Sequence, residues 1–182
     1  MRIIGGRWKR TPLPVPDAPG LRPSPDRVRE TLFNWLAHLI PDFSDVSALD
    51  LFAGTGALGF ELASRGAKHV TLVERNPMLE AQLQRTKQKL GADSVTVVRG
   101  EALAYAQAAR AESVDVVFLD PPFDSNLLRP AVQAAARLVP AGGLVYAESG
   151  APFEEDAAAE CGLQIARSGR AGQVHFHLLQ RA

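Results

Sequence analysis

From residue 46 onward, short apolar runs alternate with longer segments in which apolar residues recur at helical spacing. The runs predict strands, and the segments between them predict helices that begin at prolines or end at glycines. The predicted strands are 46–52, 69–74, 95–98, 114–119 and 143–148, and the predicted helices are 57–65, 77–90, 102–110 and 127–139. Two further strands, 162–169 and 173–180, follow around a turn that contains glycine.

This alternation predicts an α/β fold with a doubly wound, mostly parallel, Rossmann-like sheet. We expect an antiparallel strand at its C-terminal end, because the last two predicted strands are joined by a short turn. In such sheets, ligands bind beyond the carboxyl ends of the strands. The candidate site residues should therefore be sought at the strand ends.

The first 45 residues follow a different pattern. Residues 2–4 predict a short strand, and the six prolines of residues 11–25 predict a stiff, extended loop. A helix should begin with Ser24 as N-cap and Pro25 at its first position, and should end before Pro41. We therefore expect an N-terminal basic extension with a helix, residues 1–40, packed on a main domain of residues 41–182.

Charge is distributed unevenly along the 182 residues, although the formal net charge is zero. Residues 1–30 hold seven basic and three acidic side chains, and the remainder holds 13 basic and 17 acidic. A basic arm on a mildly acidic body predicts an anionic partner, the alternative being a solvated surface segment. The single cysteine, the absence of an apolar leader and the absence of a bilayer-length apolar run favour a cytoplasmic protein without a membrane partner.

The stretch DLFAGTGALG places Gly54, Gly56 and Gly59 between a predicted strand and a predicted helix. Glu74 ends the next strand, 20 residues after Gly54, where a carboxylate can accept both hydroxyls of a ribose. This pattern fits a nicotinamide-dependent oxidoreductase, a methyltransferase, or a loop that only packs helix on sheet. Asp50 favours the methyltransferase, because a carboxylate ahead of the glycines suits the cationic amino group of S-adenosyl-L-methionine better than a pyrophosphate.

The predicted strand 114–119 ends in Asp120-Pro121-Pro122-Phe123. Such a sequence suits methylation of an exocyclic amino group, whose nitrogen lone pair is delocalised into the ring. Asp120 and the carbonyl of Pro121 can accept the two N–H groups, and the paired prolines fix the direction of that carbonyl. Phe123 offers a face on which a base can stack. The alternative is a rigid turn after a buried strand.

The order DLFAGTGALG, VE and FLDPPF resembles class I S-adenosylmethionine-dependent N-methyltransferases. The N-terminal blocks RIIGGRW and GLRPSPDRVRETLFNWL are similar to those of the RsmD family, the guanine-N2 methyltransferases of 16S ribosomal RNA. The resemblance implies methylation of one guanine, nucleotide 966 in the usual 16S numbering, in the small ribosomal subunit or its precursor. It also implies a cytoplasmic enzyme, which we expect to be a monomer.

The resemblance also implies roles for individual residues. The methionine end of S-adenosyl-L-methionine would be lined by Asp50, Phe52, Gly54, Thr55 and Gly56, its ribose held by Glu74, and its adenine approached by Asn76 and Glu101. Asp120, Pro121, Pro122 and Phe123 would hold the guanine as catalytic residues. From the charge distribution, we expect the RNA to contact Arg2, Arg7, Lys9, Arg10 and Arg22 around the mouth of the cofactor cleft. Arg27 and Arg29, with Arg22, flank the start of the first helix, where they meet RNA or, as the alternative, pack and pair with Asp26 or Glu30.

No metal site is expected. His175 and His177 alternate along one predicted strand, but further ligands at suitable spacing are missing, and we expect a solvated or RNA-facing pair. Two other classes of protein stay open on the residues alone. One is an NAD-dependent oxidoreductase on the same fold, and the other is a non-catalytic RNA-binding protein.

Overall fold

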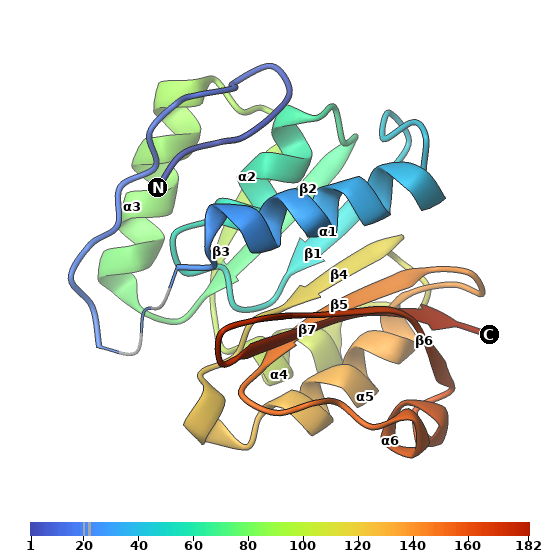
Figure 1. Cartoon of the computed structure of the whole chain (residues 1–182). Helices are drawn as coiled ribbons and strands as arrows, with labels where there is room; N and C mark the ends of the chain where they lie inside the picture. Colours follow the sequence, from blue (N-terminus) through green and yellow to red (C-terminus); the bar gives the residue numbers. More distant parts are fainter. Residues whose placement is uncertain (20, 22) are drawn as a thin grey trace.

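The computed structural model describes residues 1–19, 21 and 23–182, and its centre is a seven-stranded sheet in the order β3-β2-β1-β4-β5-β7-β6 (Figure 1). The first five strands are parallel, whereas β7 is antiparallel to both β5 and β6. The strands are β1 Ser47–Asp50, β2 His69–Glu74, β3 Val95–Arg99, β4 Val116–Leu119, β5 Leu144–Ser149, β6 Leu163–Ala171 and β7 Val174–Arg181. The predicted mostly parallel sheet with an antiparallel C-terminal strand is therefore confirmed.

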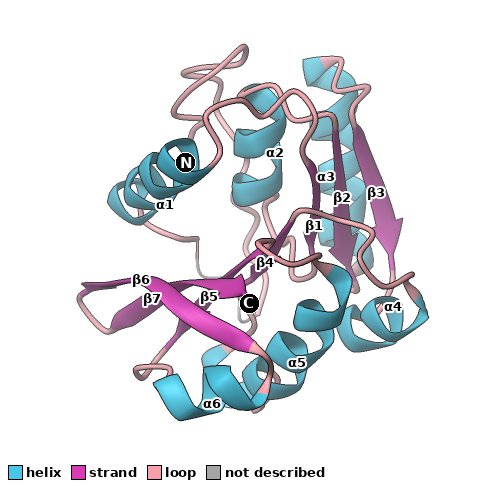
Figure 2. Ribbon diagram, turned by 90° about the vertical axis from the view of Figure 1, so that its right-hand side faces the viewer, coloured by secondary structure: helices cyan, strands magenta, loops and turns pink. Residues whose placement is uncertain are grey.

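Helices cover both faces of this sheet (Figure 2). One face carries α1 Asp26–Leu39, α2 Ala57–Ser64 and α3 Pro77–Leu90, and the other carries α4 Ala102–Ala108, α5 Leu128–Leu138 and α6 Glu155–Glu160. Two clusters of buried apolar side chains fill the spaces between helices and sheet, one on each side. The strands alternate their side chains between these clusters, and the central strands are therefore apolar on both faces.

The strand order reverses direction between β1 and β4. The chain moves from β1 outward to β2 and β3, and then returns to place β4 on the other side of β1. Asp50, the last residue of β1, pairs in register with Phe118, so Asp120 lies just beyond the end of the neighbouring strand. A sheet of this kind opens a crevice at such a reversal, beyond the carboxyl ends of the strands.

Described residues ahead of β1 contribute to the first apolar cluster. Ile3 and Leu13 are buried there with the inner face of α1. The predicted strand at residues 2–4 is wrong, because only an isolated bridge joins Arg2 to Pro12. Backbone hydrogen bonds from Ile3 to Thr11, and from Arg10 and Leu13 back to Ile3 and Met1, hold this segment beside residues 10–13. The carboxylate of Glu61 also accepts the backbone N–H groups of Ile4 and Gly5 at 2.7 and 2.8 Å.

Several predicted boundaries differ from those of the structure. The first strand stops at Asp50, two residues before the predicted end, because the chain turns at once into the glycine loop. The helix α6 was not predicted, since its six residues EDAAAE offer no apolar periodicity. Ser24 is not the N-cap of α1: Pro25 occupies that position without a side-chain cap, and the hydroxyl of Ser24 points elsewhere.

Candidate active site

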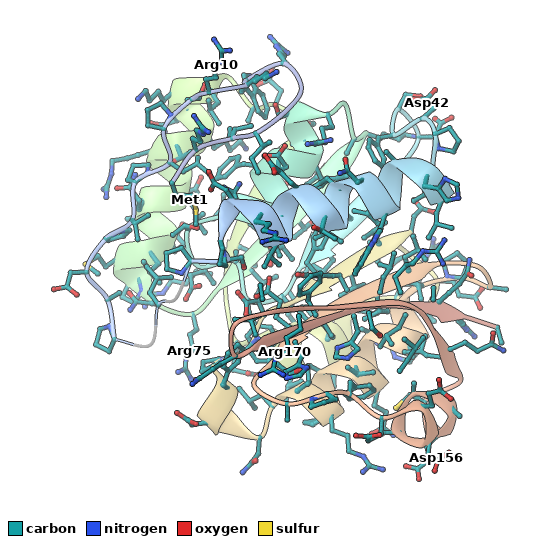
Figure 3. The ribbon with its side chains drawn as sticks, viewed as in Figure 1. Met1, Arg10, Asp42, Arg75, Asp156 and Arg170 are labelled. Atoms are coloured by element: carbon teal, nitrogen blue, oxygen red, sulfur yellow. The ribbon has the colours of Figure 1, made fainter. Side chains whose placement is uncertain are left out.

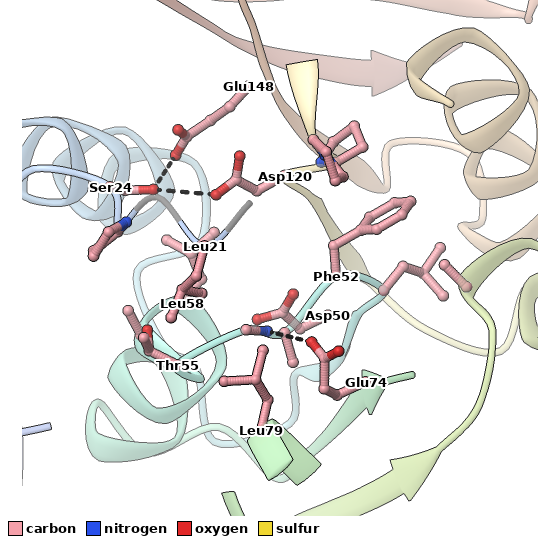
Figure 4. A pocket seen from close by; sticks show the side chains of 18 of the residues that line it. Leu21, Ser24, Asp50, Phe52, Thr55, Leu58, Glu74, Leu79, Asp120 and Glu148 are labelled. Atoms are coloured by element: carbon pink, nitrogen blue, oxygen red, sulfur yellow. Dashed lines mark hydrogen bonds between the residues drawn. The ribbon is translucent and has the colours of Figure 1, made fainter. Parts of the chain in front are cut away.

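A cavity of about 330 Å³ opens at the carboxyl ends of the first four parallel strands, at the reversal of strand order (Figure 4). The ends of β1, β2, β3 and β4 line it, together with residues of the proline-rich loop such as Leu21 and Ser24. Every cofactor and catalytic residue predicted from the sequence except Gly56 lies in its lining, and Gly56 caps the helix that begins at its wall. The sequence motifs thus converge on one site.

The glycine loop turns sharply from β1 into α2. Gly56 has a φ of +77°, and a Cβ there would lie 2.6 Å from the ring of Phe60. Gly59 packs the first turn of α2 against β2, where a Cβ would lie 2.1 Å from Leu72. Side chains at these positions would push the helix away from the sheet, and the wall of the cavity would open.

The carboxylate of Glu74 is held in a fixed orientation at the end of β2. Its Oε2 accepts the backbone N–H of Gly54 at 2.9 Å (Figure 4), and its Oε1 accepts that of Asn76 at 2.8 Å. Each oxygen retains a further lone pair toward the cavity. A diol is a ligand that such a pre-oriented carboxylate can bind through both oxygens.

Asp50 lies almost fully buried at the base of the loop, with 2% of its surface exposed. Its Oδ1 has no hydrogen-bond partner among the residues that the structure describes. Burial raises the pKa of Asp50 from 3.8 to about 7, and backbone N–H groups of Gly59 and Phe52 oppose the rise. A buried carboxylate oxygen without a partner, in the wall of a cavity, fits a cationic ligand group.

Asp120, itself partly exposed, forms with the buried Glu148 an acidic cluster that the sequence motifs did not predict. The hydroxyl of Ser24 donates to Oε1 of Glu148 at 2.6 Å and lies 3.5 Å from Oδ2 of Asp120. The phenol of Tyr146 also donates to Oε1 of Glu148, at 2.9 Å. Burial and the charge of Glu148 raise the pKa of Asp120 well above its usual range, and burial raises the pKa of Glu148 despite its hydrogen bonds from Ser24 and Tyr146.

The residues after Asp120 leave the sheet in a stiff, short path. Pro121 is buried, Pro122 is exposed, and Phe123 begins a single 3-10 turn, Phe123–Ser125. The ring of Phe123 is partly exposed at the cavity and lies beside Gly150, where a Cβ would approach it to 3.5 Å. Asp120 and an exposed aromatic surface therefore face the same space.

Three further predicted cofactor residues already have a structural partner. Asn76 caps α3 by accepting the N–H of Met78 at 2.9 Å, and Glu101 caps α4 by accepting that of Ala104 at 2.8 Å. The hydroxyl of Thr55 lies 3.4 Å from the sulfur of Met1. All three line the cavity, as does Phe52, which is partly buried.

Arg2, Arg7, Lys9 and Arg10 are exposed, but none of the four lines the cavity. Arg7 binds through its backbone N–H to the carbonyl of Ser64, at the C-terminal end of α2. That end lies about 12 Å, one length of this helix, from the glycine loop. Figure 3 shows Arg10 well away from Arg75, which does line the cavity. Arg7, Lys9 and Arg10 therefore do not lie around the mouth of the cleft, where they were expected. Arg2 lies nearer to it, since its Nε is 3.6 Å from Oδ2 of Asp26, next to Pro25 in the cavity wall. RNA contacts of all four stay a prediction.

The other two predicted RNA-contact residues, Arg22 and Arg27, do not belong to this group. Arg27 is exposed on the first turn of α1, close in sequence to Ser24 and Pro25 in the cavity wall. Arg22 lies outside the described residues. Arg29, two residues further along α1, is fully buried and donates to Asp26 and to the carbonyl of Arg2, so it anchors the arm.

The acidic cluster shows which site residues were missed. Glu148 is an acid at the end of a predicted parallel strand, the same position that singled out Glu74, and this was the available signal. Ser24 gave a misleading signal, because Ser before Pro is typical of a helix start. His177 was also misjudged: it is buried, and its Nε2 accepts the N–H of Phe153 at 3.3 Å.

Within the described residues, no group of three or more metal-binding side chains is found. The helices described are all too short or too polar to cross a membrane.

Comparison with other proteins identifies relatives along the whole chain. The family model described as Conserved hypothetical protein 95 matches residues 1–180. The chain is 41% identical to the Escherichia coli (strain K12) protein Ribosomal RNA small subunit methyltransferase D, over all of this chain and 90% of that protein. It is 44% identical to the protein of that name from Haemophilus influenzae, over 72% of this chain and 68% of the relative.

Solved structures agree with these sequence relatives. A candidate methyltransferase from Escherichia coli superposes with a TM-score of 0.84 at 40% identity, covering all of this chain and 97% of the other. A candidate methylase from Haemophilus influenzae superposes with a TM-score of 0.81 at 33% identity, covering 99% of this chain and 97% of the other. Both confirm the Rossmann-like fold.

Proposed function

The chain belongs to the family described as Conserved hypothetical protein 95, the RsmD family of methyltransferases, and we propose that it methylates the 2-amino group of a guanine in 16S ribosomal RNA. S-Adenosyl-L-methionine would be the methyl donor. The observation that carries this proposal is the position of Asp120: it faces the same cavity as the glycine loop and Glu74.

The cavity suits S-adenosyl-L-methionine at two points. The buried, unpartnered oxygen of Asp50 fits the cationic amino group of the methionine part. The oriented carboxylate of Glu74 fits the ribose hydroxyls. Asn76 and Glu101 lie beyond Glu74 in the cavity wall, on the side where the adenine would extend. When bound, the cofactor would supply an electrophilic methyl group, whose bond to the sulfonium sulfur breaks so that neutral S-adenosylhomocysteine leaves.

The residues at the end of β4 would prepare the amine. Asp120 and the carbonyl of Pro121 accept the two N–H groups, which turns the nitrogen lone pair toward the methyl group. Phe123 holds the base by stacking. Positive charge develops on the nitrogen as the new bond forms, and the adjacent carboxylate of Asp120 stabilises it and accepts the proton that the nitrogen then releases.

The raised pKa values of Asp50 and Asp120 are compatible with these roles. In the site without ligands, burial and the mutual repulsion of the carboxylates favour the protonated forms of Asp50 and Asp120. A cationic group beside Asp50 and N–H donors at Asp120 favour the ionised carboxylates, so binding of both ligands should release protons.

The substrate class rests on the relatives. Their name assigns them to ribosomal RNA of the small subunit, and we propose the same RNA here, in the small subunit or its precursor, with guanine 966 as the target. The enzyme would act as a monomer in the cytoplasm. The exposed arginines and lysine of the arm, with Arg27, would attract the phosphates that the acidic cavity repels.

The experiment that tests the proposal uses labelled methyl groups. The protein is incubated with labelled S-adenosyl-L-methionine and with small ribosomal particles that lack the modification, and the labelled nucleotide is mapped and hydrolysed to its base. We expect label on N2 of one guanine, at position 966. Absence of transfer, or label on another base, would contradict the proposal. Stabilisation of the protein by NADH and not by S-adenosylhomocysteine would favour an oxidoreductase.

A further inference from the structure

We infer that Glu148 makes this site specific for guanine, by accepting the ring N1–H that lies beside the amino group held by Asp120. The inference rests on the proposed function and adds a specificity residue to it. It is carried by the sheet register, by the hydrogen bonds that orient Glu148, and by the donor pattern of the base.

The register places the two acids side by side. Leu119 of β4 pairs in parallel with Ala147 of β5, so Asp120 and Glu148 follow at the same level of the sheet. Side chains at paired positions of neighbouring strands point to the same face, and neighbouring strands lie roughly 4.8 Å apart. Both residues line the cavity together with Phe123.

The orientation of Glu148 leaves one oxygen for a ligand. Ser24 and Tyr146 both donate to Oε1, at 2.6 and 2.9 Å. Within the described part of the chain, the hydrogen bonds found to this carboxylate all end on Oε1, and Oε2 receives none. Figure 4 shows Ser24 between Glu148 and Asp120, so one hydroxyl positions the two carboxyl groups relative to each other.

The two neighbouring acceptors, Asp120 and Glu148, match the hydrogen-bond donors of guanine but not those of the other bases that carry an amino group. Guanine presents the 2-amino group beside a protonated ring nitrogen, N1–H. Adenine and cytosine present their amino group beside an unprotonated ring nitrogen, whose lone pair would face the carboxylate of Glu148. Bases taken out of a stack are read by hydrogen bonds to their Watson–Crick edge. Asp120 alone would accept any of these amino groups, whereas the pair accepts only a donor–donor edge.

The alternative is that Glu148 only anchors Ser24 and the proline-rich loop. A substitution would then lower activity on every base alike. The two roles are separated by 2-aminopurine, which keeps the amino group of guanine but has an unprotonated N1. The experiment compares kcat/KM for small-subunit particles that carry guanine or 2-aminopurine at the target position, with wild type and Glu148→Gln.

The substitution Glu148→Gln should replace one hydrogen-bond acceptor of the site by a donor. The carbonyl oxygen of this glutamine can still accept from Ser24 and Tyr146, and its NH₂ group then occupies the place of Oε2, where it donates. For wild type we expect a preference for guanine of about 100-fold, the upper end of what one unsatisfied buried hydrogen-bonding group costs. For Glu148→Gln we expect kcat/KM with guanine to fall by about 100-fold and kcat/KM with 2-aminopurine to rise by roughly 10-fold.

The rise with 2-aminopurine is the decisive outcome, because a damaged fold cannot produce it. Glu154→Gln, an exposed acid at the start of α6, is the matched control and should change neither value. Parallel losses on both bases, or an unchanged preference, would overturn the specificity role of Glu148 while leaving the methyltransferase intact. If wild type fails to methylate guanine at all, the proposed function itself is contradicted.

Discussion

Replacing Asp50 by Asn should stabilise the free protein at pH 8 and remove most of its affinity for the cofactor. The pKa of Asp50 rises from 3.8 to about 7 on folding, because the carboxylate is buried. A shift of this size corresponds to about 4 kcal/mol of unfolding free energy lost when the group is ionised. The uncharged amide of Asp50→Asn avoids that cost. Its NH₂ group, however, stands where Oδ1 of Asp50 has no partner among the described residues, and a buried donor without an acceptor costs about 1–3 kcal/mol.

The expected net gain is therefore about 1–3 kcal/mol, or a rise in Tm of roughly 2–10 °C for a chain of this length. The sign depends on pH. The folded protein binds a proton at Asp50 between pH 4 and 7 that the unfolded chain has lost, so wild type loses stability as the pH rises through this window. The advantage of Asp50→Asn should appear at pH 8 and vanish at pH 5.

Thermal unfolding at both pH values, with and without S-adenosylhomocysteine, measures both effects. Wild type should gain more stability from this ligand at pH 8 than Asp50→Asn does, because the ionised Asp50 pairs with the ligand's amino group. Asp93→Asn, on an exposed turn, is the control and should match wild type throughout. A variant that is less stable than wild type at pH 8, or that binds S-adenosylhomocysteine equally well, would refute this account of Asp50.

Three further substitutions test other parts of the site. Glu74→Ala should weaken S-adenosylhomocysteine binding by about 1–3 kcal/mol in calorimetry, because hydrogen bonds to a charged group are removed, and an unchanged Kd would exclude Glu74 from the ribose. Phe123→Ala should lower kcat/KM for the ribosomal substrate by the equivalent of about 1–3 kcal/mol, the scale of one stacked base, and full activity would mean that the ring does not stack. Joint replacement of Arg7, Lys9 and Arg10 by Ala should reduce the slope of log affinity against log salt by about 0.7–0.9 for each phosphate that the arm no longer binds, with S-adenosylhomocysteine binding unchanged. An equal slope would show that the arm does not touch RNA.

Substitution tests the arm better than deletion does. Residues 3–5 contribute an apolar side chain to the core and two N–H groups to the buried carboxylate of Glu61. Removing them would leave this acid with fewer partners in the interior, which is strongly destabilising. The exposed side chains of Arg7, Lys9 and Arg10 can be shortened without disturbing that anchor.

The parts of the fold that follow from periodicity were predictable from the sequence. Strand–helix alternation fixes a parallel sheet, and the sheet brings strand ends together, so Asp50, Glu74 and Asp120 were expected at one edge before any geometry was known. The glycine loop was predictable for the same reason, because a tight strand-to-helix turn needs positive φ at Gly56.

The acidic cluster behind Asp120 was not predictable in this way. Ser24 lies 124 residues from Glu148, and local sequence favoured a helix cap for its hydroxyl. The hydrogen bond between them exists because Ser24 lies in the cavity wall at the strand ends, a tertiary position that no local pattern encodes. Arg29 is a similar case, since the carbonyl of Arg2 that accepts from its guanidinium lies 27 residues away in the chain.

The measurement that tests the central claim most directly is methyl transfer by Asp120→Ala beside wild type, with cofactor affinity measured on the same preparations. Asp120 would act on the amine and not on the cofactor. The account therefore predicts unchanged binding of S-adenosylhomocysteine and a decrease of at least about 100-fold in the rate of label transfer to ribosomal particles. Transfer at the wild-type rate by a variant without this carboxylate would contradict the role of Asp120 and the interpretation of the strand end on which the proposed function depends.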